Sequence, residues 1–347
     1  MNRVLTKLAT AAGGVSLLAA GVAAAASLGG FPIQEPSRPA PGGGGDVPSA
    51  KGAAQVIVDA NGPGPYKTIS AAVKAVKEGG YIYVMHGVYN ESITVTKSIF
   101  IQGDRGPGSG VEIIAPMGES CLTFAPTQGT AHAVVSNVSF QAKISSVNAG
   151  CVDVGSGVFT LKESNVLGST VSPAIRVSGG TVVLEKNRIG GGSEGIFVEQ
   201  SHTLSQTFVI DNKIAGNKVG IDIAPGSRAD VVVAGNEIFD NTVTGLKSSG
   251  YGGATVIGNK IRNNKGAGVI LDKYSKLALI RYNEIVKNDG DGVAVPFGAN
   301  GIIEDNEIVG NTGLGIYVRE GLAPKITNNF LSNNAGDKKP KRSSSRN

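Results

Sequence analysis

Acids, bases and aromatic rings recur at one position of a short strand that repeats through this 347-residue sequence. The strand opens with Cys, Ala or Gly, and its third residue reads Thr123, Asp153, Arg176, Phe197, Asp222, Lys247, Ile270, Ala294 and Tyr317. The fifth residue adds Glu199, Asp272 and Arg319. Since successive side chains alternate between the faces of a strand, the third and fifth residues share the outward face. Charged groups can bind sugar hydroxyls and a ring can pack on a sugar face, so we predict a saccharide-binding groove with these substrate-binding residues: Asp153, Arg176, Phe197, Glu199, Asp222 and Lys247.

The same residues allow two other interpretations. Neighbouring acids and bases could serve lyase, epimerase or hydrolase chemistry, although no catalytic residue is assigned. Opposite charges on stacked strands also stabilise strand pairing modestly, which would make the column structural. A second column with the same mixture of signs is interpreted as solvated surface: Arg188, Lys213, Glu237, Lys260, Glu284 and Glu307.

Residues that could hold a metal are few. The chain has three His, and His86, His132 and His202 fall in different repeats, so we predict no metal site and no cofactor. The run from Asp289 to Gly292 resembles part of a calcium loop, but the other ligands of such a loop are missing. We interpret that run as a tight corner.

Asparagine sets the period of the sequence. One series recurs every 23–25 residues, and a second Asn follows five residues later from Asn212 onward. A repeat this short, with two or three strands, cannot bury its apolar face alone, so neighbouring repeats must stack into a solenoid. We predict an all-β, single-stranded parallel β-helix, in which the Asn side chains turn inward at the bends and bond from coil to coil. The first series is Asn187, Asn212, Asn236, Asn259, Asn283, Asn306 and Asn329.

A short helix is expected before the repeats. Residues Thr68 to Lys77 place Ile69, Ala72, Val73 and Val76 on one face, and Gly79-Gly80 ends the pattern. Strands are expected at 56–58, 81–85 and 93–101. The helix would then cap the N-terminal end of the solenoid.

The chain divides into four predicted parts. Residues 1–26 have a charged start, an apolar stretch and small residues, which is typical of a signal peptide and predicts a secreted or periplasmic protein without a membrane span after cleavage. A retained membrane anchor is the alternative. Residues 27–53 are a Pro/Gly-rich linker, 54–336 form the β-helix, and 337–347 are a basic tail that we expect to be disordered.

The net charge of +5 does not indicate nucleic-acid binding. The tail 337–347 carries +4 and the first residues, Arg3 and Lys7, carry +2, so the residues between carry about −1. Nucleic-acid binding requires clustered Lys and Arg on one face, and the body has no such cluster.

Cys121 and Cys151 are the only cysteines, and both open the repeated strand. If their coils are neighbours, stacked strands about 4.8 Å apart would place them within reach of a disulfide. A bridge and an unbonded stacked pair are both consistent with this position.

Residues 56–104 resemble the opening of pectin methylesterases and other pectin-lyase-like proteins, and the Asn-x-Ile repeats look like NosD-type β-helix repeats. Together the resemblance covers residues 55–335 and implies a right-handed parallel β-helix. The first resemblance rests on Tyr66-Lys67-Thr68-Ile69, Ala71-Ala72-Val73, Gly87-Val88-Tyr89-Asn90-Glu91 and Ile101-Gln102-Gly103-Asp104.

The resemblance implies no particular activity. The three segments that supply the oxyanion donor and the aspartates of pectin methylesterases are absent, and His86 stands where many relatives have Pro. NosD relatives are linked to copper delivery, but three His, three Met and two Cys are too sparse and scattered to indicate copper.

Two hypotheses of function remain. The first is an exported protein that binds or modifies an acidic polysaccharide along an outer sheet face. The second is a non-catalytic scaffold that presents loops to a protein partner. The fold supports the first only by analogy, and the sequence leaves the oligomeric state open.

Overall fold

A computed structural model describes residues 53–105, 110–127, 130–143, 149–199, 205–225, 227–251, 253–273, 275, 278–299 and 301–337. The predicted signal peptide, nearly all of the linker, the tail after Asp337 and His202 lie outside these residues, so the expectations about them stay predictions. Among the described residues no helix is long and apolar enough to cross a membrane.

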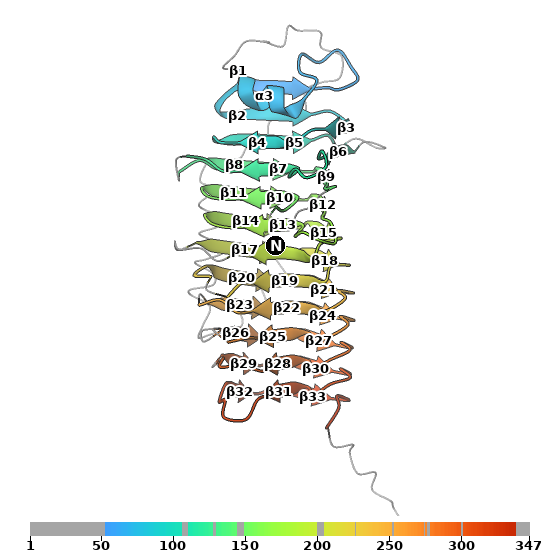
Figure 1. Ribbon diagram of the computed structural model, residues 1–347, viewed down its shortest axis with the longest axis vertical. Helices are drawn as coiled ribbons and strands as arrows, with labels where there is room; N and C mark the ends of the chain where they lie inside the picture. The colour runs from blue at the N-terminus through green and yellow to red at the C-terminus, as the bar shows by residue number, and fades with distance from the viewer. Residues whose placement is uncertain are drawn as a thin grey trace, which may run out of the picture. The chain divides into compact units, whose positions relative to one another are not determined.

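Three parallel sheets wind around one core, and from β2 (Val76–Val84) onward the chain adds one strand to each sheet in turn (Figure 1). Sheet A contains β1 (Ala53–Val58), β2 (Val76–Val84), β5 (Ile99–Gly103), β8 (His132–Ser136), β11 (Val158–Lys162), β14 (Thr181–Glu185), β17 (Gln206–Ile210), β20 (Asp230–Ala234), β23 (Ala254–Ile257), β26 (Leu279–Arg281), β29 (Ile302–Glu304) and β32 (Lys325–Thr327). Sheet B contains β3 (Gly87–Asn90), β6 (Val111–Ile114), β9 (Ser139–Gln141), β12 (Asn165–Leu167), β15 (Arg188–Gly190), β18 (Lys213–Ala215), β21 (Glu237–Phe239), β24 (Lys260–Arg262), β27 (Glu284–Val286), β30 (Glu307–Val309) and β33 (Phe330–Ser332). Sheet C contains β4 (Ile93–Val95), β7 (Leu122–Phe124), β10 (Val152–Val154), β13 (Ile175–Val177), β16 (Glu194–Val198), β19 (Val219–Ile223), β22 (Thr244–Ser248), β25 (Val269–Leu271), β28 (Val293–Val295) and β31 (Ile316–Val318).

The core is a stack of aliphatic side chains, one layer per coil. On sheet B, for example, Ile238, Ile261, Ile285 and Ile308 occupy the same inward position of successive strands and are fully buried. Each coil covers the apolar face of the one before it, which is why a repeat too small to fold alone is stable in the stack. The predicted right-handed parallel β-helix is confirmed.

Two asparagine ladders line the bends, as predicted. In the first, each side-chain amide nitrogen (Nδ2) donates to the Oδ1 of the next Asn at 2.9–3.0 Å, from Asn187 to Asn329. The second ladder, from Asn217 to Asn334, has the same bonds at 2.9–3.1 Å. Each Oδ1 also accepts from the backbone N–H of the preceding Asn, as Asn259 does from Asn236 at 2.9 Å. These bonds satisfy backbone groups that the tight bend would otherwise bury without a partner.

The N-terminal end is covered by α3 (Ile69–Ala75), the one helix among the described residues. Thr68 is its N-cap, and the Glu91 carboxylate accepts from the free backbone N–H groups of Ile69 and Ser70 at 2.7 and 2.8 Å. The capping helix is thus confirmed, but its predicted end at Lys77 was wrong. Val76 is already extended and begins β2, because its side chain is buried in the first coil.

The strand expected over 93–101 was also wrong in extent. It is divided into β4 on sheet C and β5 on sheet A. The two apolar runs face the same core from different sheets, so the pattern alone did not reveal the corner between them.

Candidate functional site

The outward-facing residues predicted from the repeats form one continuous column on sheet C. Strand pairing places Thr123, Asp153, Arg176, Phe197, Asp222 and Lys247 side by side on successive coils, and the column continues to Tyr317. The flanking residues of each strand, such as Ile221 and Ile223, are buried in the core. We call Asp153, Arg176, Phe197, Glu199, Asp222, Lys247 and Asp272 the sheet C column.

The column contains the same acid–base–acid arrangement twice. In each copy, the third residue of one strand is an acid and the third residue of the next strand is a base. The fifth residue of the strand after that is the second acid. The first copy is Asp153, Arg176 and Glu199, and the second is Asp222, Lys247 and Asp272. Corresponding residues are three coils apart, which is about 14 Å at the spacing of paired strands.

The first copy is closed by internal bonds. Arg176 Nη2 lies 2.7 Å from Glu199 Oε2. The Asp153 carboxylate accepts from Ser120 Oγ at 2.7 Å and from the backbone N–H of Gly150 at 2.9 Å. Burial raises the pKa of Asp153, while these two donors and the nearby Arg176 act in the opposite direction.

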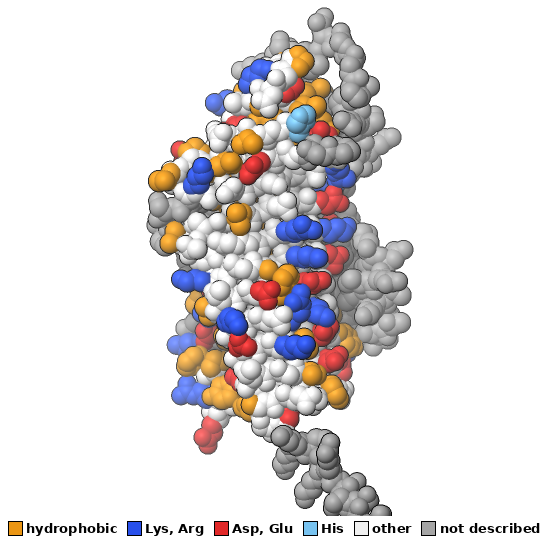
Figure 2. All heavy atoms as spheres, turned by 90° about the vertical axis from the view of Figure 1, so that its right-hand side faces the viewer, with side chains coloured by type: hydrophobic (Ala, Val, Ile, Leu, Met, Phe, Trp, Pro, Cys, Tyr) orange, Lys and Arg blue, Asp and Glu red, His pale blue; other side chains and the backbone are white. Residues whose placement is uncertain are grey.

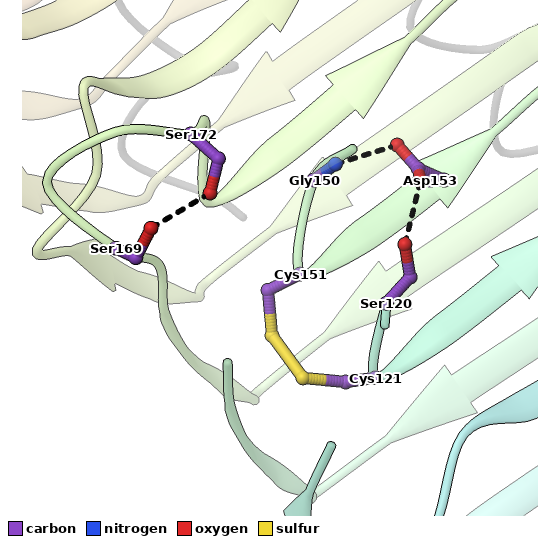
Figure 3. The surroundings of a disulfide bond; sticks show 7 residues. All are labelled: Ser120, Cys121, Gly150, Cys151, Asp153, Ser169 and Ser172. Carbon is purple, nitrogen blue, oxygen red and sulfur yellow. Dashed lines mark hydrogen bonds between the residues drawn. A yellow bond between two sulfur atoms is a disulfide. The ribbon is translucent and has the colours of Figure 1, made fainter. Parts of the chain in front are cut away.

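A disulfide supports the first copy from inside. Cys121 and Cys151 immediately precede the neighbouring sheet C strands β7 and β10, are fully buried, and are bonded to each other with their Cα atoms 5.0 Å apart. Figure 3 shows that Ser120 and Gly150, the residues just before the two cysteines, are the ones that bond Asp153. The cross-link therefore fixes the two loop ends that hold this carboxylate.

The second copy has fewer internal bonds at its first acid, Asp222. Lys247 Nζ is 3.8 Å from Asp272 Oδ2, a longer contact than that of Arg176 with Glu199. Asp222 Oδ1 is buried and has no hydrogen-bond partner among the described residues. Burial raises the pKa of Asp222 to about 6. The charge of Lys247 lowers this pKa, and the charges of Glu194 and Asp272 raise it further. A carboxyl group with such a pKa can exchange a proton near neutral pH.

The two copies meet at Phe197, whose neighbours across the strands are Arg176 and Asp222. Its ring is partly exposed on the outer face. A ring between two charged groups, with an unsatisfied carboxylate oxygen beside it, can contact the apolar face and the hydroxyls of a sugar together.

Sequence reasoning missed Glu194 and the importance of Asp272. Glu194 begins β16 just before the repeated Gly, at a position where the next two strands have Val219 and Thr244. Its charge raises the pKa of Asp222, and the repeat has no acid at this position in the next two strands. With Glu194 included, the column has five carboxylates against Arg176 and Lys247, a formal charge of −3.

The second charged column lies on sheet B, on the face seen in Figure 2, where basic and acidic side chains are mixed. Lys260 pairs with Glu284 at 2.8 Å, and Arg262 lies 3.7 Å from Glu237 and 4.3 Å from the centre of the Phe239 ring. These exposed side chains bind one another, which agrees with a solvated surface.

Among the described residues no group of three or more His, Cys, Asp or Glu is arranged to hold a metal ion. His86 is 63% exposed and its Nδ1 lies 3.9 Å from Asp104 Oδ2. His132 starts β8, where burial lowers its pKa. At the corner after Asn288, Asp289 pairs with Lys265 at 2.9 Å and Asp291 Oδ1 accepts from the backbone N–H of Leu314 at 2.7 Å, so both carboxylates have structural partners.

Comparisons with known proteins agree with this fold. The sequence model of the family described as "Periplasmic copper-binding protein (NosD)" matches residues 141–344. A mannuronan C5-epimerase of Pseudomonas putida is 30% identical over 94 residues, which are 26% of this chain and 18% of that protein. The chain thus spans about a fifth of the length of that curated relative.

Solved structures share the fold at low sequence identity. XylC in complex with xylose has a TM-score of 0.57 at 11% identity, with 75% of this chain and 69% of that chain covered. The Dettilon tailspike protein has a TM-score of 0.54 at 12% identity, with 79% and 68% covered.

Proposed function

The chain belongs to the NosD family of periplasmic copper-binding proteins, and we propose that it binds or modifies an acidic polysaccharide along the sheet C column. The observation that carries the proposal is the buried Asp222 Oδ1, which has no partner among the described residues and lies between Phe197 and Lys247. A buried acceptor without a hydrogen bond costs free energy. A hydrogen bond from a sugar hydroxyl to this oxygen would remove that cost and so favour the complex.

The spacing of the two acid–base–acid copies favours a polymer over a single sugar. A ligand that reaches both Arg176 and Lys247 must extend along three coils of the solenoid, about 14 Å. The relative named as a mannuronan C5-epimerase supports a polymer of acidic sugars as the ligand class.

The charges of the sheet C column should make ligand binding depend on pH. At neutral pH the five carboxylates oppose an anionic ligand, while Arg176 and Lys247 attract it. The raised pKa values of Asp153 and Asp222 mean that both carboxyls become neutral more easily than ordinary acids as the pH falls. Binding should therefore be stronger in mildly acidic solution.

Copper, which the family description names, does not fit the donors of the described residues. Cys121 and Cys151 are bonded to each other, and His86 and His132 lie on different coils. Met117 is 78% exposed on a turn. Copper sites use clustered imidazole and sulfur ligands, so no step of the proposed function passes through copper. A periplasmic or secreted location is part of the proposal and is consistent with the family and with the predicted signal peptide.

The test is retention on an array of acidic polysaccharides. Arg176→Ala and Asp222→Ala should each abolish retention without lowering the melting temperature. Lys260→Ala removes a cation of the sheet B column that, like Arg176, pairs with a Glu on the next coil, and it should leave retention unchanged.

The second candidate function is a scaffold that presents loops to a protein. It is favoured by the internal bonds that occupy Arg176 and Asp153 in the first copy. Absence of retention of the intact protein on a broad glycan panel would reject the polysaccharide proposal and leave the scaffold.

A further inference from the structure

The last coil leaves its core uncovered. Ile326 of β32 and Leu331 of β33 occupy inward positions and are each 42% exposed, whereas Ile303 and Ile308, their neighbours one coil earlier, are fully buried. At the opposite end, α3 covers the first coil (Figure 1). The two ends of the described solenoid therefore differ, since one is capped by the chain and the other is apolar and open.

The hydrogen bonds at the open end are also incomplete. Strands β31, β32 and β33 are the last strands of sheets C, A and B, so all three edges end at one coil. Asn306 Nδ2 donates to Ile280, Glu304 and Asn329. Among the described residues, Asn329 Nδ2 donates only to Ile303 O, at 2.8 Å.

The second ladder, in contrast, is closed within the chain. Asp337 Oδ2 accepts from the backbone N–H and from Nδ2 of Asn334, at 2.8 and 3.0 Å. Its carboxylate thus takes the place of the amide oxygen of a following Asn. Residues 338–347, KKPKRSSSRN, contain no aliphatic or aromatic side chain other than Pro340 that could cover Ile326 and Leu331.

Exposed sheet edges and apolar ends are a liability that solenoid proteins normally cover. We propose that the open end binds the same end of a second copy of this chain. Head-to-tail stacking would require removal of α3, which packs on β1 and β2 at the other end. Contact of two identical open ends is instead closed and self-complementary.

We place the two-fold axis of the dimer through the Asn329 corner and the middle of β31. This symmetry pairs the exposed strand edges and brings opposite charges together. It pairs β31 with its own copy and β32 with β33 of the second copy, all antiparallel. The start of β32 then meets the corner that follows β33. Lys325 is 63% exposed, and among the described residues its Nζ makes only a 4.0 Å contact with Glu304 Oε2 of its own chain. In the dimer it approaches Asp337 of the second copy, and this contact occurs twice. Ile326 and Leu331 of the two copies cover one another.

Sedimentation equilibrium of the full chain tests the inference. The wild type should form a dimer at concentrations up to about 100 μM, where a Kd of order 1 μM gives nearly complete association. Leu331→Lys should abolish the dimer, since it places two ammonium groups in an apolar contact. The control Val243→Lys changes a 50% exposed apolar residue away from this end and should leave the dimer intact.

Lys325→Glu keeps the test decisive if Leu331→Lys disturbs folding, since Lys325 is largely exposed. It should weaken the dimer at least about fivefold, because two exposed ion pairs are lost and two like-charge contacts with Asp337 replace them. Hydrogen exchange at the amides of β31, β32 and β33 should slow as the wild-type concentration rises. A wild type that stays monomeric at every concentration, or a dimer that survives Leu331→Lys in a folded protein, would overturn the inference.

Discussion

Replacement of Asp222 by Asn should stabilise the protein in a way that depends on pH. Burial raises the pKa of Asp222 from 3.8 to about 6 in the folded chain. Above pH 6 the folded state holds a carboxylate that it solvates poorly, whereas the unfolded chain solvates it well. The folded state therefore carries a penalty at high pH, and this penalty disappears as the pH falls from 6 to below 3.8, where both states hold the proton.

The size of the effect follows from the difference of about two pKa units. At about 1.4 kcal/mol per unit the penalty is about 3 kcal/mol, and relaxation around the partly exposed side chain reduces it. We expect Asp222→Asn to raise the free energy of unfolding by about 1–3 kcal/mol at pH 8 and by almost nothing near pH 4. The amide has the size of the carboxyl group, so packing against Phe197 is preserved.

Urea unfolding of wild type and variant at several pH values measures this difference directly. Asp240→Asn is the matched control, because it makes the same chemical change at an exposed position after β21. A gain from Asp222→Asn that is the same at pH 4 and pH 8 would refute the argument, and so would a loss of stability at pH 8.

Three further predictions concern binding and the stack. Retention on an acidic polysaccharide should increase as the pH is lowered from about 8 to about 5, and Asp222→Asn should remove much of this dependence, as measured by affinity chromatography. Replacement of both Cys121 and Cys151 by Ser should lower the free energy of unfolding by about 3–4 kcal/mol, since the bridge closes a loop with a sequence separation of 30; chemical denaturation measures the loss. Asn259→Ala should cost about 2–3 kcal/mol, because it removes the acceptor of the Asn236 backbone N–H, one of the bonds of Asn236 Nδ2, and the side-chain donor to the carbonyl of Val233; Asn165→Ala, on an exposed position of β12, should cost far less in the same thermal melts.

The repeats predicted the fold because they encode stacking directly. An Asn every 23–25 residues and an apolar residue two positions later define both the bend and the inward face. The register of sheet C could therefore be predicted from the sequence, and it agrees with the observed strand pairing. Where the chain departs from the repeat, the prediction lost accuracy. Val76 fits a helical face as well as a buried strand, and only its place in the first coil decided between them.

The sequence by itself determined which residues face outward on sheet C and that acids, bases and Phe197 share one column. Only the tertiary structure decided that the two acid–base–acid copies differ. Asp153 receives hydrogen bonds from Ser120 and Gly150, loop residues that the disulfide brings together, whereas Asp222 has Oδ1 buried without a partner among the described residues. The physical reason is that solvation of a side chain depends on the loops and neighbouring coils around it, and these lie outside the repeat that sets its position.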